Sequence, residues 1–135
     1  MKNKNIRRVV AIWYLTAFYR AQMLLIPSKK LEKRWGKRGE ESPADDTSWN
    51  YKYAYDVSTD VNRIAGKTPW KSKCLVRALT VRYFLRRKGI TSTMYLGVGK
   101  DENGKMIAHS WLRCGKLYAT GGNGDGYGIV AKFCL

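Results

Sequence analysis

The chain has 135 residues, of which 44% are hydrophobic, and it carries a formal net charge of +16 at pH 7. This length suits one domain with its own hydrophobic core, and the composition excludes a disordered chain. The charge raises the question of nucleic-acid binding. However, no nucleic-acid motif occurs and aromatic residues do not alternate with the basic ones, so no nucleic acid is expected as a partner. The charge instead indicates a solvated basic face or an acidic peptide or protein partner.

The three cysteines Cys74, Cys114 and Cys134 are an odd number at wide spacing and form no Cys-x-x-Cys pair. Such spacing is no disulfide framework and is typical of a reducing compartment, so a cytoplasmic protein is expected. The single histidine, His109, leaves the chain without the usual ligand pairs of a zinc site. A phosphate-binding glycine–lysine motif is also missing. We therefore expect no metal, no ATP and no other cofactor.

Residues 6–26 are predicted to form the first helix, which Pro27 ends. Part of this stretch, residues 9–26, is apolar enough to suggest a signal peptide or a membrane span. Arg20 and Gln22 interrupt it, however, and no small-residue cleavage site follows. The sequence favours an amphipathic helix docked on the domain, with at most peripheral membrane contact; an interfacial membrane helix is the alternative.

A short helical turn is predicted at residues 31–37, followed by a polar, proline-containing linker at residues 39–49. A second long helix should span residues 49–66, because its apolar positions step by three and four. The linker divides the chain into an N-terminal helical segment with linker, residues 1–48, and a core, residues 49–135.

Residues 68–89 are typical of a basic helix with an apolar face, and they place Cys74 in the first turn. Ser72 is a good N-cap, which puts Cys74 at the second helical position. The partial positive charge of a helix start, with Lys71 and Lys73 nearby, favours a thiolate there. This placement makes Cys74 the candidate nucleophile.

From residue 92 onward the apolar residues alternate with a period of two, which is typical of strands. The predicted strands are residues 92–100, 106–113, 116–120 and 127–135. Two-residue hairpin turns are predicted at Asn103-Gly104 and Cys114-Gly115, and a glycine loop at residues 121–128. Helices followed by an antiparallel sheet predict an α+β domain.

Two-residue turns fix which residues of neighbouring strands face each other. They would place Val98 and Thr120 across from His109. One apolar face would then carry Leu96, Val98, Ile107, His109, Trp111, Tyr118 and Thr120. The helix that holds Cys74 is the nearest element able to cover this face, so His109 is expected to lie beneath it.

A cysteine and a histidine in this arrangement can attack a carbonyl carbon, because the imidazole accepts the thiol proton. The unpaired N–H of Cys74 in the first helical turn could donate to the oxyanion. This is the arrangement of papain-like and transglutaminase-like enzymes. The alternative is that Cys74 is a small buried hydrophobe and His109 a structural group.

Two stretches of the chain resemble the leader peptidases of bacterial lasso-peptide biosynthesis. The first, PWKSKCLVRALTVRYFLRRKGI, contains Cys74; the second, TMYLGVGKDENGKMIAHSWLRCG, contains His109 within Ala-His-Ser-Trp. The resemblance implies a transglutaminase-like, papain-like cysteine protease core. It also implies a hydrolase of antibiotic biosynthesis that removes the leader from a ribosomally made precursor (a RiPP). A separate ATP-dependent cyclase would then close the lasso ring.

The same resemblance implies an acidic residue about a dozen residues after the histidine, to orient the imidazole. In this sequence Thr120 and glycines occupy that region, with Asn123 and Asp125 nearby. The predicted register favours Thr120, whereas chemistry favours Asn123, because papain-like enzymes use asparagine in this role. The predicted catalytic residues are therefore Cys74 and His109, with Thr120 or Asn123 as the third.

Leader recognition is expected to reside on a separate protein, since the residues before the cysteine show no winged-helix β pattern. The expected partners are the lasso precursor peptide and this leader-recognition protein, with the ATP-dependent cyclase as a further candidate. Two alternatives to the peptidase stay open. One is an acyltransferase or amidase of the same fold, and the other is a non-catalytic basic module that binds nucleic acid or an anionic membrane.

Overall fold

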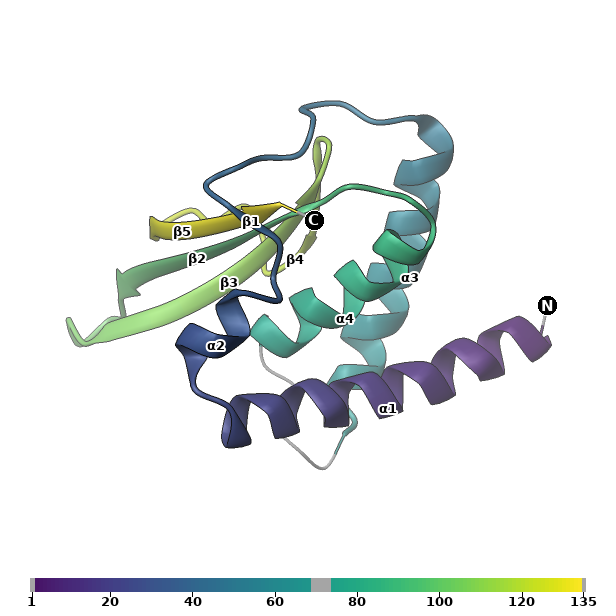
Figure 1. The fold of residues 1–135 in the computed structure, drawn as a ribbon, viewed down its shortest axis with the longest axis horizontal. Coiled ribbons are helices and arrows are strands. Elements are labelled where there is room, and N and C mark those ends of the chain that lie inside the picture. Colours follow the sequence, from purple (N-terminus) through teal and green to yellow (C-terminus); the bar gives the residue numbers. More distant parts are fainter. Residues whose placement is uncertain (1, 69–73, 135) are drawn as a thin grey trace.

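Three long helices and a five-stranded antiparallel sheet make up the part of the chain that the structure, a computed structural model, describes: residues 2–68 and 74–134 (Figure 1). The helices are α1 (Lys2–Leu25), α3 (Ser48–Ala65) and α4 (Cys74–Arg87), with a short α2 (Ser28–Glu32) after the first. α4 packs on β3 and β4 of the sheet, and α1 lies across α3 and α4. The predicted α+β architecture is confirmed.

The long helices begin and end close to the predicted positions. α1 ends two residues before Pro27, whose ring cannot continue a helix. α3 begins after Thr47, which caps it by accepting a hydrogen bond from the Asn50 amide at 3.2 Å. α4 begins at Cys74, and the predicted cap Ser72 lies outside the described residues.

The N-terminal segment packs into the same hydrophobic core as the rest of the chain. Ile12 of α1, Leu31 of α2 and Trp35 are 0%, 3% and 5% exposed and belong to one cluster with residues of α3, α4 and the sheet. The Trp35 ring meets Phe133 of β5 edge-on, with 5.4 Å between the ring centroids. These contacts fasten α1 and α2 to the helices and the sheet.

The last strand lies inside the sheet. The strands are β1 (Lys37–Arg38), β2 (Thr93–Lys100), β3 (Met106–Cys114), β4 (Leu117–Thr120) and β5 (Gly128–Cys134), in the order β1-β5-β2-β3-β4. The predicted helical turn at residues 31–37 is therefore only partly helical, because β1 pairs with β5 there.

The loop between β2 and β3 is longer than predicted. The sequence favoured a two-residue turn at Asn103-Gly104, but β2 and β3 are joined by the five residues 101–105. The carboxylate of Asp101 accepts hydrogen bonds from the amides of Asn103 and Lys105, both at 2.9 Å. The Asp101 carboxylate thus satisfies two backbone N–H groups of the longer loop. A two-residue turn would not need such acceptors.

The longer loop shifts the pairing of β2 with β3 by one residue. Gly97, and not Val98, lies across from His109, and Tyr95 lies across from Trp111. The predicted register of this hairpin is wrong. Because side chains alternate between the two faces of a strand, a shift of one residue moves a whole set of side chains to the other face.

The second hairpin also differs from the prediction. Its two-residue turn is Gly115-Lys116, one position later than expected, and the pairing shifts within β3 after Leu112. Thr120 consequently lies across from Leu112. The prediction that Thr120 faces His109 is wrong.

The two faces of the sheet therefore have different neighbours. Met94, Leu112 and Cys114 are fully buried and share a core cluster with α4. Tyr95 and Trp111 are 5% and 3% exposed but lie on the other face, where their rings stack with 5.4 Å between centroids. This second face is shielded by loops.

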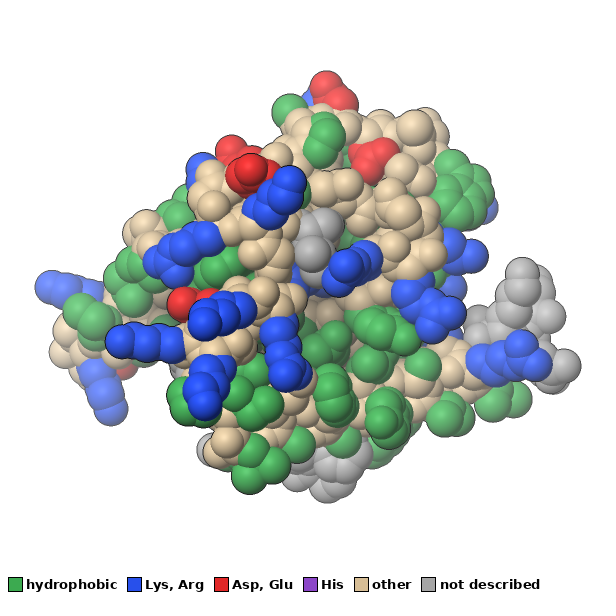
Figure 2. Space-filling model, in the orientation of Figure 1, with side chains coloured by type: hydrophobic (Ala, Val, Ile, Leu, Met, Phe, Trp, Pro, Cys, Tyr) green, Lys and Arg blue, Asp and Glu red, His purple; other side chains and the backbone are tan. Residues whose placement is uncertain are grey.

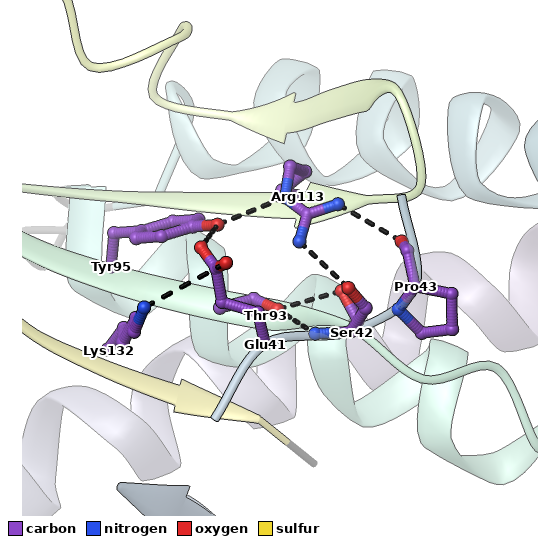
Figure 3. A network of polar contacts seen from close by, with 7 residues as sticks. All are labelled: Glu41, Ser42, Pro43, Thr93, Tyr95, Arg113 and Lys132. Carbon is purple, nitrogen blue, oxygen red and sulfur yellow. Dashed lines mark hydrogen bonds and ion pairs between the residues drawn. The ribbon is translucent and has the colours of Figure 1, made fainter. Parts of the chain in front are cut away.

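The segment between β1 and α3, residues 39–46, lies against this second face, where Arg113 holds it (Figure 3). The Arg113 guanidinium donates to the carbonyls of Ser42 and Pro43 at 3.0 and 3.1 Å, and to the Tyr95 hydroxyl at 3.0 Å. That hydroxyl donates in turn to Glu41 at 2.7 Å. The sequence predicted a linker here, and these hydrogen bonds give it a fixed place on the sheet.

Replacing Arg113 should loosen this segment. Arg113→Met should lower the free energy of unfolding by about 3 kcal/mol, because several charge-assisted hydrogen bonds disappear together. Denaturant unfolding followed by circular dichroism measures the change. The matched control is Arg63→Met, which removes an ion pair with Asp60 at 3.4 Å and should change stability by less than about 1 kcal/mol. Equally small losses in both variants would show that the segment is held without Arg113.

Candidate functional site

Cys74 is the first residue of α4, a helix of 14 residues. Its side chain is half-buried, and its thiol forms no disulfide. Apolar residues of α4, among them Leu79, Val81 and Leu85, are at most 3% exposed and hold the helix against the core. Because the first amides of a helix have no partner within it, the backbone N–H of Cys74 is a possible donor to a substrate oxygen.

His109 lies on β3 with its ring fixed from two sides. Its Nε2 is 2.7 Å from the carbonyl oxygen of Gly121. A carbonyl can only accept, so Nε2 carries the proton and Nδ1 keeps a free lone pair. The imidazole also stacks on Tyr127 and Trp111, with 4.7 and 5.9 Å between ring centroids. This tautomer makes Nδ1 the nitrogen able to accept a proton.

In the structure the glycine loop spans residues 121–127, because β5 begins at Gly128. Several of its positions must be glycine, since the loop packs closely over Trp111. Gly121 has a φ of 74°, and a Cβ there would be 2.4 Å from the Ser110 carbonyl oxygen. A Cβ on Gly124 would likewise meet the Trp111 indole at 2.4 Å. Side chains at these positions would push the loop outward, and with it the carbonyl that holds His109.

The predicted third residues do not hydrogen-bond to His109 in the structure. Thr120 is 2% exposed, and its hydroxyl has no hydrogen-bond partner among the described residues. Asn123 is exposed and bonds to Asp125 through its amide nitrogen, at 3.2 Å. The group that holds the imidazole is the carbonyl of Gly121, 12 residues after His109. The spacing of about a dozen residues indicated this region of the chain, but the sequence could not show that a backbone carbonyl, and not a side chain, contacts the imidazole there.

The His109 imidazole hydrogen-bonds to Gly121 and not to Cys74 among the described residues. Leu112 shares the core with α4, and side chains alternate along a strand, so Ser110 also faces α4 while His109 points to the opposite face. Thr120 lies across from Leu112, so it is on the same face of the sheet as Ser110. Both residues are 2% exposed, and neither hydroxyl has a hydrogen-bond partner among the described residues. The roles of Cys74, His109, Thr120 and Asn123 in catalysis stay predictions.

The other two thiols are poor nucleophiles. Burial, followed by the nearby Asp46 carboxylate, raises the pKa of Cys114 to about 12. Its thiol donates to Asp46 with 3.5 Å between sulfur and oxygen. Burial also raises the pKa of Cys134, with Glu40 as a further cause. Since the thiolate is the reactive form, neither cysteine suits covalent catalysis near neutral pH.

No group of three or more His, Cys, Asp or Glu side chains within residues 2–68 and 74–134 is placed to hold a metal ion. None of the helices described there, α1 included, combines the length and the apolarity that a bilayer crossing requires.

Comparison with protein families assigns the fold. The family model of the transglutaminase-like superfamily (Transglut_core3) matches residues 11–131. The chain belongs to this superfamily. The match contains both Cys74 and His109, and it confirms the predicted transglutaminase-like fold. A search of curated proteins gives no significant match, and neither does a search of solved structures.

Membership of the transglutaminase-like superfamily gives a broad chemical class, because the superfamily includes cysteine peptidases and acyltransferases. Both chemistries begin with a cysteine thiolate that attacks an acyl carbon. Among the three cysteines, only Cys74 lies at the start of a long helix, and the other two have raised pKa values. Of the three cysteines, Cys74 is therefore the one that best fits the predicted nucleophile.

Alkylation should distinguish the three thiols. Near neutral pH, iodoacetamide should label Cys74 before Cys114 and Cys134, because the raised pKa values of the latter two keep them as thiols. Mass spectrometry of peptides at successive times gives the order. In the denatured protein all three should react at similar rates. Faster labelling of Cys114 or Cys134 in the folded protein would contradict this assignment.

The carbonyl of Gly121 should set the tautomer of His109. Nitrogen NMR of the neutral imidazole should show the proton on Nε2 in the native protein. Gly121→Ala should abolish this preference, since its Cβ would meet the Ser110 carbonyl at 2.4 Å. Gly122→Ala is the matched control: its φ is 75°, but nothing lies within 4 Å of the added Cβ. If both variants keep the native tautomer, a group other than this carbonyl fixes the ring.

Proposed function

We propose that this chain is a cysteine endopeptidase that removes the leader from a lasso-peptide precursor. The observation that carries the proposal is the position of Cys74 as the first residue of α4 in a transglutaminase-like chain. The two stretches around Cys74 and His109 support the choice of substrate, since they resemble lasso leader peptidases in both order and spacing. A cytoplasmic location fits a peptidase with free thiols.

The proposed reaction has two steps. The imidazole of His109 accepts the thiol proton of Cys74 at Nδ1, and the sulfur attacks the scissile carbonyl carbon. The backbone N–H of Cys74 donates to the resulting oxyanion, and the imidazolium returns its proton to the departing amine. Water, deprotonated by the same imidazole, then hydrolyses the thioester and releases the leader.

The role of Gly121 in this scheme is to position the base. Its carbonyl accepts from Nε2, which leaves Nδ1 free and opposes rotation of the ring. In papain-like enzymes an asparagine side chain serves the same purpose. Thr120 and Asn123 remain proposed alternatives for the third residue. Thr120→Val, which keeps the shape without the hydroxyl, should leave the rate unchanged if the carbonyl suffices.

The chemistry requires Cys74 and His109 to meet. In the structure β3 turns His109 away from α4, and a shift of one residue in its pairing with β2 would carry His109 to the helix side. The pairing can be tested without any substrate. If imidazole assists the thiol, His109→Ala should slow alkylation of Cys74 near neutral pH, whereas the labelling of Cys134 should not change.

A separate leader-recognition protein is part of this proposal. The described residues before Cys74 form α1, α2, β1 and α3, which are not the elements of a winged-helix unit, and their buried apolar side chains belong to the domain core. The partner would bring the precursor to the peptidase and raise its local concentration. The ATP-dependent cyclase that acts after cleavage is a further candidate partner.

The decisive experiment uses the precursor peptide with and without the recognition protein, with products identified by mass spectrometry. Native protein should cleave between leader and core, faster when the partner is present. Cys74→Ala should abolish cleavage, and His109→Ala should slow it by a factor of about 10² to 10⁴. Cys134→Ala is the matched control, since this cysteine is also half-buried but is not proposed to react.

Other products would point to other functions. Undiminished cleavage by Cys74→Ala would exclude the cysteine mechanism. Transfer of the acyl group to an added amine, in place of hydrolysis, would identify the acyltransferase that the same fold also serves. Equal cleavage with and without the recognition protein would refute the division between two chains. Salt-sensitive binding to DNA or anionic vesicles, without any cleavage, would favour a non-catalytic basic module.

A further inference from the structure

A cavity of about 240 Å³ lies between α1, α4 and the residues after α2, apart from Cys74 and His109. Three arginines line it, Arg34, Arg82 and Arg86, together with aromatic side chains that include Phe18 and Tyr83. None of the described residues that line the cavity is acidic. Its wall is therefore cationic and aromatic, which is an unusual lining for a space formed partly by core residues.

Arg82 is the central residue of this cavity. It is 4% exposed, and its guanidinium donates to the carbonyl oxygen of Trp35. Among the described residues that carbonyl is its one hydrogen-bond acceptor, and no carboxylate lies within ion-pair distance of it. A guanidinium offers five N–H donors, so most of those of Arg82 have no acceptor among the described residues.

The charge of Arg82 persists at neutral pH. Burial lowers its pKa to about 10, which still leaves the group protonated. Burial raises the pKa of the neighbouring Tyr19, so that phenol stays neutral and supplies no compensating charge. A buried cation without a counterion is unfavourable unless an anion joins it. The cavity beside it is where such an anion fits.

The surroundings extend the positive potential. Arg34 and Arg86 also line a neighbouring, more open hollow of about 680 Å³, together with Lys33 and Lys37. Glu40 is the one acidic residue among the described residues that line this hollow. Figure 2 shows Lys and Arg side chains gathered over α2 and its surroundings, next to the hydrophobic side chains along α1. This potential would attract an acidic group toward Arg82.

An apolar stripe on α1 leads to the cavity. Ile6, Val10, Tyr14 and Phe18 follow at intervals of four residues and are 60%, 62%, 69% and 43% exposed. The rings of Tyr14 and Phe18 stack, with 6.3 Å between centroids. Phe18 belongs to both the stripe and the cavity wall. An occupant should therefore carry apolar side chains next to an anionic group.

We propose that this cavity and the adjoining stripe bind an acidic peptide segment of a partner protein, with a carboxylate on Arg82 and a neighbouring apolar side chain on Phe18. The fork of a guanidinium matches the two oxygens of a carboxylate. A flat membrane surface could meet the stripe, but it could not reach a side chain that is 4% exposed. The site does not depend on the chemistry proposed for Cys74.

Binding can be measured with short probes. The test probe is an acetylated, amidated peptide with one glutamate between two phenylalanines, and its matched control replaces the glutamate by glutamine. Isothermal titration with the full chain should show binding of the glutamate peptide and at least about tenfold weaker binding of the glutamine peptide. Inorganic phosphate and phosphatidylglycerol vesicles are tested separately, as alternative sources of an anion.

Two substitutions locate the site. Arg86→Glu reverses one charge in the cavity wall and should weaken binding of the glutamate peptide by at least about tenfold. Arg7→Glu makes the same change on α1, about 16 Å along the helix from Phe18, the nearest α1 residue of the cavity wall, and should have little effect on these short peptides. Arg82→Met should abolish binding, and the Arg86 variant keeps the test valid if the Arg82 variant fails to fold.

Each outcome decides the proposal. Preference for glutamate, lost in Arg86→Glu and kept in Arg7→Glu, would support it. It is overturned if both peptides bind alike, if neither peptide binds, or if both variants weaken binding equally. Binding of vesicles or phosphate alone would also overturn it, in favour of a lipid or phosphate site.

Discussion

The pairing of His109 with Gly97 across β2 and β3 is the contact on which the surroundings of the histidine depend. Gly97 has no side chain, and a Cβ there would lie 2.8 Å from the Trp111 ring. The indole can therefore lie flat on the sheet between Tyr95 and His109. The glycine loop closes over this row of rings, and its first carbonyl reaches the imidazole. A residue with a Cβ at position 97 would disturb all of these contacts.

Two arginines show how the same side chain serves different purposes in this fold. Arg113 is partly exposed, and its hydrogen bonds to backbone carbonyls and to Tyr95 hold the 39–46 segment on the sheet. Arg82 is almost fully buried but has one acceptor among the described residues, the carbonyl of Trp35. The first guanidinium is satisfied within the chain and is structural. The second has one acceptor among the described residues and faces a cavity, which is why we propose it as the group that binds a carboxylate.

Of the two proposed catalytic residues, Cys74 lies at the start of a helix as the sequence predicted, whereas His109 lies on the other face of its strand from the one predicted. Cys74 is tied to α4, whose apolar side chains are locked into the core. His109 is tied to the glycine loop on the other face of β3. Ser110 and Thr120, with hydroxyls that lack partners among the described residues, occupy the face toward α4.

The sequence by itself determined the helices, the α+β class and the fold family. Apolar periodicity and Pro27 defined α1 and α3, and the stretches around Cys74 and His109 indicated the transglutaminase-like fold. These features are local, since they depend on which residues stand near each other along the chain.

Only the tertiary structure decided the strand register and the contacts that follow from it. The Asp101 carboxylate stabilises a five-residue loop where the sequence favoured two, and this changes which face His109 occupies. The hydrogen bond between His109 and the Gly121 carbonyl could not be predicted either, because every residue has a backbone carbonyl and the sequence does not show which one a side chain will contact. The burial of Arg82 away from carboxylates likewise depends on which side chains surround it in the folded chain, and residue spacing in the sequence does not predict this. Register, backbone contacts and burial join residues far apart in the chain, so they are settled only when the elements pack.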